Sequence, residues 1–266
     1  MSKMISVDLE FNKDKEILSA GMLQIEKGIL KSIDEFFFEN KVDRHTYKIH
    51  GLSEDFLKKN STKGVKESDL RDMVKDSNYI IGFDLRNDFL ALNINSSLIY
   101  GERKVIDIRH ILSFFDIKGS LESVSKKLGI FSKCKGMFPI HTSIMDSLLS
   151  YLIFEYFVVF ISSEKRCDKK EILKDLADMS SCSYFSESWM YDHYYEKYFL
   201  LYKELKKIDK INIPKKAVTS KRIKIPFTNH IEVYDEHFNI VGKIKKAKTK
   251  KENIFFKPEI LLGYKE

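Results

Sequence analysis

The chain has 266 residues, of which 43% are hydrophobic and 32% are charged, a balance that predicts a folded soluble protein and excludes a disordered one. This length fits one large or two modest domains. The net charge of +7 is unevenly placed, because residues 1–160 carry about equal numbers of basic and acidic side chains. The basic excess in residues 161–266 indicates either a patch that meets a polyanion or an ordinary lysine-rich surface.

The first 38 residues predict three antiparallel strands, over 4–11, 17–25 and 29–38, with Lys27-Gly28 at the second turn. Helices and short strands alternate after them. We expect strands over 78–83 and 104–107, and helices from Ser53, over 67–75, through 89–94, after Asp107, over 120–129 and over 143–162. Strands first, followed by strand–helix alternation, predict an α/β domain with a mixed sheet over about residues 1–162.

The remainder of the chain has a different pattern. Residues 169–179 and 187–208 predict helices, and the second is rich in aromatic side chains. Four short β-like runs follow, over 222–225, 230–234, 240–244 and 253–256. We therefore predict one domain over 1–163 and a C-terminal helical and basic β-rich region over 164–266.

Cysteine usage and hydropathy predict where the protein resides. The three cysteines, Cys134, Cys167 and Cys182, are odd in number and lack the spacing of a metal site. We expect reduced thiols in a cytoplasmic protein. The first residues contain no long apolar core, which predicts no secretory signal. The most apolar stretch, 148–161, contains Glu155 and is too short to span a bilayer, so we expect a buried helix and no membrane partner.

The acidic residues carry the chemical prediction. Asp8 and Glu10 are two positions apart on a strand, so both leave the same face, about 6–7 Å apart along the chain. An acidic residue, Asp84 or Asp88, lies just past a buried strand at the start of a helix, where α/β sheets build sites. His141 precedes a helix that would present Asp146. Four carboxylates and a histidine suit metal-assisted hydrolysis, in which the acids hold two cations and the histidine deprotonates water.

These segments resemble, in order and spacing, the three motifs of the DEDDh (DnaQ-like) 3′–5′ exonucleases, a family of the ribonuclease H-like superfamily. The motif segments are Asp8-x-Glu10, Gly82-x₅-Asp88-Phe89-Leu90 and His141-x₄-Asp146. Weaker matches are His50-Gly51-Leu52, Val105-Ile106-Asp107, and Ser120-Leu121 with Leu128-Gly129. The resemblance covers about residues 3–160. It implies a mixed five-stranded sheet flanked by helices, to which this chain adds a C-terminal helical and small β extension.

The resemblance also implies an activity, the hydrolysis of terminal phosphodiester bonds of nucleic acid to nucleoside 5′-monophosphates. Asp8, Glu10, Asp88 and Asp146 would ligate two Mg²⁺ or Mn²⁺ ions, and His141 would take a proton from the attacking water. The implied partner is a nucleic acid 3′ end, with DNA slightly favoured over RNA. The expected substrate-binding residues are Leu9, Phe11 and His50, together with Lys245, Lys246 and Lys248 of the basic C-terminal run.

The chain departs from the family pattern beside its predicted metal ligands. After Glu10 the family often has Thr-Gly or Thr-Thr-Gly, where this chain has Phe11-Asn12. In the second motif, Asn87 replaces the phenylalanine that directly precedes the catalytic aspartate, Asp88. These changes concern substrate positioning more than metal binding.

A further departure leaves two candidates for the second-motif ligand. The family's His-Asn is replaced here by Phe83-Asp84, so that Asp84 is an alternative to Asp88. We prefer Asp88, because its distance from Gly82 and the apolar pair that follows it fit the pattern.

Two other functions stay open beside an exonuclease. One is an interaction module on the same fold, whose C-terminal region docks a polymerase or another protein. The other is a specialised nuclease that this region directs to a structured RNA or DNA. The sequence leaves open the choice of DNA or RNA and the oligomeric state.

Overall fold

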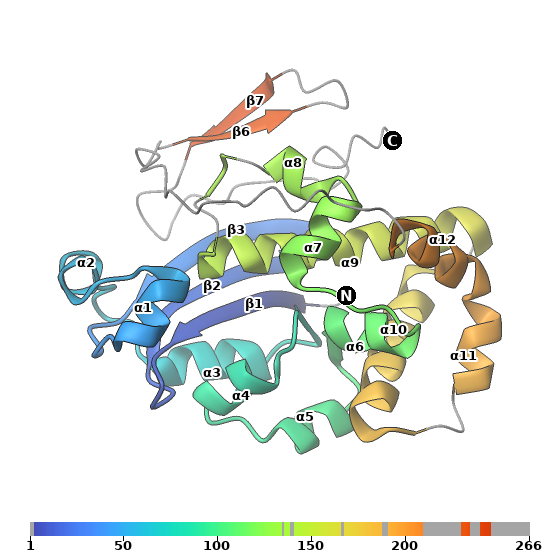
Figure 1. Cartoon of the computed structure of the whole chain (residues 1–266), viewed down its shortest axis with the longest axis horizontal. Coiled ribbons are helices and arrows are strands. Elements are labelled where there is room, and N and C mark those ends of the chain that lie inside the picture. The colour runs from blue at the N-terminus through green and yellow to red at the C-terminus, as the bar shows by residue number, and fades with distance from the viewer. Residues whose placement is uncertain are drawn as a thin grey trace.

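The computed structural model describes residues 3–134, 136–138, 141–165, 168–187, 191–209, 230–234 and 240–245 (Figure 1). At its centre is a five-stranded mixed sheet with the order β3-β2-β1-β4-β5. Strand β2 is antiparallel to β1 and β3, whereas β4 is parallel to β1 and β5. These strands are β1 (Lys3–Phe11), β2 (Ile17–Glu26), β3 (Ile29–Phe37), β4 (Tyr79–Gly82) and β5 (Val105–Asp107). The predicted α/β class and mixed sheet are confirmed.

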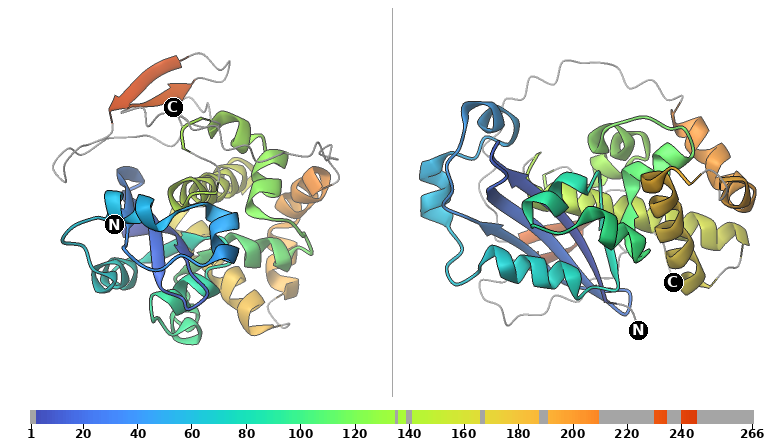
Figure 2. Two further views of the ribbon diagram at one scale, coloured as in Figure 1. Left: turned by 60° about the vertical axis from the view of Figure 1, so that its left-hand side comes forward. Right: turned by 90° about the horizontal axis from the view of Figure 1, so that it is seen from below.

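Helices cover both faces of the sheet (Figure 2). They are α1 (Arg44–His50), α2 (Glu54–Asn60), α3 (Glu67–Lys75), α4 (Arg86–Ala91), α5 (Ser96–Gly101), α6 (Ile108–Phe114), α7 (Leu121–Lys127), α8 (Ile130–Cys134), α9 (Ser143–Lys165), α10 (Lys169–Phe185), α11 (Tyr191–Lys197) and α12 (Phe199–Asp209). Strands β6 (His230–Tyr234) and β7 (Ile240–Lys245) form a separate antiparallel hairpin.

The alternation in β1 separates two hydrophobic cores. Ile5, Val7 and Leu9 pack with α3, α4 and α5 on one face. Met4 packs on the other face, in a core that α9 dominates and to which α6, α7, α10 and α12 contribute. Asp8 and Glu10 share this second face, which is where the N-terminal end of α9 lies.

Helix α9 is the central helix of the larger core. Within the described residues, Ser143–Ser163 is the one helix long and apolar enough to cross a membrane, and 78% of it is buried inside the protein. Side chains such as Phe154 and Phe157 are fully buried, and each contributes about 1.5–3 kcal/mol through burial. The predicted buried helix is confirmed, but the expectation that its apolar stretch is too short to span a bilayer is wrong, because the apolar helix runs over Ser143–Ser163.

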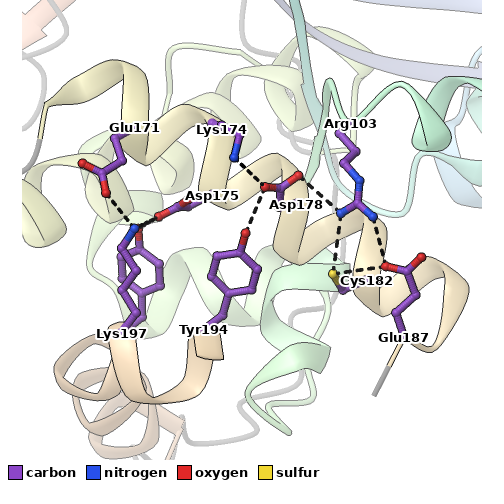
Figure 3. A network of polar contacts seen from close by, with 10 residues as sticks. Arg103, Glu171, Lys174, Asp175, Asp178, Cys182, Glu187, Tyr194 and Lys197 are labelled. Atoms are coloured by element: carbon purple, nitrogen blue, oxygen red, sulfur yellow. Dashed lines mark hydrogen bonds and ion pairs between the residues drawn. The ribbon is translucent and has the colours of Figure 1, made fainter. Parts of the chain in front are cut away.

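Helix α10 is held in place by a network of ion pairs and hydrogen bonds (Figure 3). The guanidinium of Arg103 lies 3.3 Å from Asp178, and Tyr194 of α11 donates to the same aspartate at 2.9 Å. Lys197 of α11 lies 2.5 Å from Asp175. The carboxylates of α10 are therefore neutralised by cations and hydroxyl groups of neighbouring elements.

Two predictions about the C-terminal helices are corrected by the structure. The helix expected over 169–179 continues to Phe185, because Ser180, Ser181 and Cys182 remain buried against the sheet domain. The single helix expected over 187–208 is two helices, α11 and α12, which meet at a turn at Tyr198. The Tyr198 hydroxyl bonds to Asp175 of α10, which turns this side chain towards the core.

The predicted hairpin strands over 230–234 and 240–244 are confirmed as β6 and β7. The β-like runs over 222–225 and 253–256 lie outside the described residues, as does Cys167. Cys134 and Cys182 are free thiols. The boundary between 163 and 164 stays a prediction, and residues of α9 and α10 share one hydrophobic core.

Candidate functional site

Three carboxylates meet where β1 ends and α9 begins. Ligand oxygens of Asp8, Glu10 and Asp146 all lie within 4.8 Å of one another, and all three side chains are partly buried. Asp8 and Glu10 come from the same face of β1, and Asp146 lies in the first turn of α9. This arrangement matches the oxygen-only ligand sets that bind Mg²⁺ and Mn²⁺.

A glycine allows α9 to approach β1 closely enough to form this cluster. Gly21 pairs directly with Asp8 across the β1–β2 ladder. A Cβ atom added at Gly21 would lie 2.2 Å from the carbonyl carbon of Ser143. Reciprocal hydrogen bonds of 2.9 and 3.0 Å then join the hydroxyl of Ser6 to the carbonyl of Ser147, and the hydroxyl of Ser147 to the carbonyl of Ser6. Small side chains thus bring Asp146 beside Asp8.

Sequence reasoning missed the role of Gly21. A signal for it exists, because a glycine inside an otherwise apolar strand often marks the close approach of another backbone. The sequence does not identify that backbone as the first turn of α9.

The fourth carboxylate reaches the site from α4. Asp88 is buried, and its Oδ1 accepts a hydrogen bond of 2.8 Å from the backbone N–H of Leu9, the residue between Asp8 and Glu10. Strand β1 pairs with β4 only as far as Ser6, so the N–H of Leu9 lies on an edge that β4 leaves uncovered. Asp88 occupies that edge.

A buried aspartate of β5 shapes the turn that carries α4. The carboxylate of Asp107 accepts hydrogen bonds of 2.9 Å from the N–H groups of Asp84 and Leu85, and one of 2.6 Å from the Tyr100 hydroxyl. It also accepts from the N–H of Arg109, which confirms the predicted cap of the following helix. Asp107 therefore has a structural role in holding the β4–α4 turn.

The two second-motif candidates lie in different surroundings. The side chain of Asp84 is 47% exposed and faces Arg109, with 3.5 Å between Oδ2 and Nε. Asp88 is buried and bonded to the backbone of β1. The structure therefore brings Asp88 to the strand that carries Asp8 and Glu10, and it brings Asp84 to an arginine at the surface.

Burial raises the proton affinity of three of these acids. Burial, followed by the charges of Asp146, Asp88 and Glu10, holds the pKa of Asp8 well above its usual range. Burial raises the pKa of Asp88 to about 7, although the hydrogen bond from Leu9 opposes this. Burial raises the pKa of Asp146 to about 6, against the effect of the nearby His141. A bound cation would relieve the repulsion that contributes to the shift of Asp8.

His141 lies at the edge of the cluster, two residues before α9. Its backbone has a φ of 58°, and its side chain is 46% exposed. The Nε2 atom lies 3.8 Å from Oε2 of Glu122 on α7, whose other oxygen is 2.5 Å from Lys126. Glu122 was not identified from the sequence, because its contact joins α7 to the segment before α9, and no periodicity shows such a contact.

Three predicted substrate-binding residues lie near the ends of β1 and α1. Leu9 has a buried side chain, and the group that it presents to the site is its backbone N–H. His50 is also buried, and its Nδ1 accepts a 2.9 Å hydrogen bond from the N–H of Leu52. Phe11 is partly buried beneath the ammonium of Lys15. The structure therefore places only Phe11 of these side chains partly at the surface.

Of the three predicted basic substrate-binding residues, the structure describes one. Lys245 is the last residue of β7, whereas Lys246 and Lys248 lie outside the described residues. Their part in substrate binding stays a prediction.

Comparison with protein-family models and with curated proteins finds no match to this chain. Its function must therefore be inferred from the geometry and chemistry of its own residues.

Proposed function

We propose that the protein is a metal-dependent 3′–5′ exonuclease with a ribonuclease H-like fold, acting on nucleic acid ends with a slight preference for DNA. The observation that carries the proposal is the meeting of Asp8, Glu10 and Asp146, with Asp88 bonded to the strand between the first two. The sheet order β3-β2-β1-β4-β5, with only β2 antiparallel, is compatible with this fold.

The site residues fit divalent cations. Their donor atoms are all carboxylate oxygens, which Mg²⁺ and Mn²⁺ prefer. Among the described residues, no lysine or arginine forms an ion pair with Asp8, Asp88 or Asp146, so their charge is left for a cation from solution. Asp8, Glu10, Asp88 and Asp146 would hold two such ions. When bound, these ions lower the pKa of water and stabilise negative charge on a phosphodiester.

His141 would accept the proton of the attacking water. It is exposed, and it lies close enough to Asp146 to influence the pKa of that residue. The water oxygen would bond to phosphorus as the P–O3′ bond breaks, one proton of the water would pass to the imidazole, and the departing 3′-oxygen would take a proton from solvent. The products are a nucleoside 5′-monophosphate and a chain with a new 3′-hydroxyl.

A labelled-oligonucleotide assay tests the proposal. The protein is incubated with 5′-labelled single- and double-stranded DNA and RNA in Mg²⁺, in Mn²⁺ and in EDTA. We expect a ladder that shortens from the 3′ end with either metal, release of nucleoside 5′-monophosphates and no products in EDTA. Binding without hydrolysis under every condition would contradict the proposal and favour an interaction module. Internal cleavage products would contradict the exonuclease assignment.

A further inference from the structure

A lysine of the β1–β2 turn contacts two residues that are adjacent in sequence to the candidate ligands Glu10 and Asp88. The Nζ of Lys15 is 3.1 Å from Oδ1 of Asn87 and 4.1 Å from the centre of the Phe11 ring. Phe11 directly follows Glu10 on β1, and Asn87 directly precedes Asp88 on α4. The ammonium group therefore connects the two segments that supply three of the four candidate metal ligands.

The turn that presents this lysine is tightly constructed. Asn12 is only 3% exposed, and its Oδ1 accepts hydrogen bonds from the N–H groups of Asp14 and Glu16. Its Nδ2 donates to the carbonyl of Lys41 at 3.0 Å, which anchors the turn to the chain after β3. The N–H of Lys15 donates to the carbonyl of Asn12. The lysine thus extends from a pre-organised loop.

The backbone of Lys15 is itself unusual. Its φ of 65° lies in the left-handed region, where glycine is accommodated without the steric cost that a side chain brings. Lys27 in the β2–β3 turn has a similar φ of 56°, so the contacts of Lys15, and not its backbone conformation, distinguish it.

The charge of this ammonium is not neutralised by its neighbours. An amide oxygen and an aromatic ring are its recorded contacts, and both are uncharged. Among the described residues, no carboxylate forms an ion pair with Lys15. Because an ammonium has three N–H donors, at least one is left for another acceptor after Asn87 takes the first and the ring faces the second.

We propose that Lys15 binds a backbone phosphate of the nucleic acid next to the bond that is cleaved, with Phe11 and Asn87 holding its ammonium in position. This inference rests on the proposed function of the acidic cluster. A polyanion that enters that cluster meets repulsion from the carboxylates, which a fixed positive charge at the edge offsets. Phe11 and Asn87 are also positions where the chain departs from the DEDDh pattern, so the contact belongs to this chain in particular.

The test compares two lysines of the same turn. Lys13 is exposed and serves as the matched control, whereas Lys15 contacts α4. Binding of a 5′-fluorescent single-stranded DNA is measured by anisotropy at several KCl concentrations, in an Asp146→Asn background with Mg²⁺ so that the probe stays intact. Hydrolysis by the variants with Asp146 retained gives kcat and KM. Lys15→Gly is added because it removes the side chain and relieves the backbone strain together.

We expect Lys15→Gln to raise Kd and KM about tenfold with kcat within about twofold of the original protein. The slope of log Kd against log salt becomes shallower by about 0.7, the value for one phosphate contact on a single strand. Lys13→Gln leaves Kd, KM and this slope unchanged. Lys15→Gly loses binding to the same extent, with a Tm that is unchanged or higher.

A merely structural lysine would give the opposite pattern, with a lower Tm in both Lys15 variants and an unchanged salt slope, and that result would overturn the inference. The two proposals fail in distinguishable ways. If the protein hydrolyses DNA but Lys15→Gln keeps the original Kd, KM and slope, the phosphate contact alone is wrong. If no substrate is hydrolysed and Lys15→Gln still flattens the salt slope, the exonuclease assignment is wrong and the phosphate contact stands.

Discussion

The carboxylates of α10 and those of the candidate site are the same kinds of side chain in opposite electrostatic surroundings. In α10, Asp178 lies 3.3 Å from Arg103 and 3.5 Å from Lys174 (Figure 3). At the site, Asp8 and Asp88 form no ion pair with a lysine or arginine of the described chain. The acids of α10 are neutralised by cations of the same molecule, whereas the acids of the candidate site lie close to one another and repel.

The difference appears in which groups have their pKa displaced. At the site, burial raises the pKa of Asp88 to about 7. In the α10 network, burial tends to lower the pKa of Lys197, but hydrogen bonds to Asp175 and Glu171 raise it. The acids of α10 hold elements together through basic and hydroxyl partners, whereas Asp8 and Asp88 have no basic partner in the described chain, which suits the cation site that we propose.

The largest expected effect comes from removing one site carboxylate. Asp8→Asn should lower kcat in Mg²⁺ by at least about 10³-fold, which corresponds to about 4 kcal/mol of transition-state stabilisation. In EDTA the same variant should be as stable as the original protein or more so, because the pKa of Asp8 is raised by burial and by neighbouring acids. Oligonucleotide hydrolysis and thermal unfolding in EDTA measure the two effects.

Asp84→Asn is the matched control for this prediction. It removes an acid of the same region that faces Arg109 instead of the cluster, so activity should stay within about threefold. Equal losses in Asp84→Asn and Asp88→Asn would show that the geometric distinction between these two residues is wrong.

The second prediction concerns an acid of α10, whose removal should lower stability and leave activity unchanged. Asp178→Ala leaves Arg103, Lys174 and the Tyr194 hydroxyl without the buried carboxylate that they share. We expect the free energy of unfolding to fall by about 3 kcal/mol, because one partner of a buried network is removed. Urea unfolding followed by circular dichroism measures this loss. At temperatures where the variant is folded, its kcat should equal that of the original protein, and a selective loss of kcat would contradict the separation of the two groups.

The third prediction concerns the spacing between β2 and α9. Gly21→Ala should lower kcat by about 10²-fold, because the backbone at Ser143 must move and Asp146 moves with it. The added methyl group should also destabilise the fold by about 1–3 kcal/mol. Gly101→Ala is the control, since nothing lies within 4 Å of its added Cβ. Activity close to that of the original protein in Gly21→Ala would show that the site tolerates the displacement.

Much of the fold follows from periodicity. The alternation of β1 predicts both its strand conformation and the shared face of Asp8 and Glu10, and the structure confirms both. Helices α1, α5 and α8 were not predicted, because five to seven residues span too few turns to show a period. The break at Tyr198 depends on a hydroxyl contact with α10, which is a tertiary interaction.

The sequence identifies the site residues only where they belong to a recognisable motif. Residue type and order identify Asp8, Glu10 and Asp146, which the structure brings together. The contacts that position them are non-local, and neither the approach of α9 over Gly21 nor the placement of Lys15 against α4 follows from local pattern. The positioning of a site therefore depends on packing that the sequence pattern does not report.

A smaller effect is expected from pH in the absence of metal. The pKa of Asp146 in the fold, about 6, exceeds its ordinary value of 3.8, so the folded protein binds this proton more tightly than the unfolded chain. The stability that results is fully present below pH 3.8 and is lost as the pH rises through 6. In EDTA, the free energy of unfolding of Asp146→Asn, relative to that of the original protein, should therefore increase by about 2 kcal/mol when the pH rises from about 4 to about 7.5.

Unfolding by urea at the two pH values measures this difference, and the comparison between variants cancels the titration of other groups. Saturating Mn²⁺ should reverse the difference at about pH 7.5, because the cation binds the folded site of the original protein more tightly than that of the variant. If the difference has no dependence on pH or Mn²⁺, Asp146 belongs with the neutralised acids of α10.

The smallest expected effect concerns Glu122, which combines features of the two groups. One of its oxygens is 2.5 Å from Lys126, as in the α10 network, and the other is 3.8 Å from His141 at the site. Glu122→Gln keeps the shape of the side chain but removes the negative charge that lies 3.8 Å from the imidazole of His141. We expect kcat to fall about fivefold with KM unchanged, whereas His141→Ala should cause a far larger loss.

Because the loss of this charge would also weaken the contact with Lys126, Lys126→Met is the control, and it should leave kcat within about twofold. An equal fall in both variants would mean that Glu122 acts by holding α7 in place, like the acids of α10, instead of acting through His141.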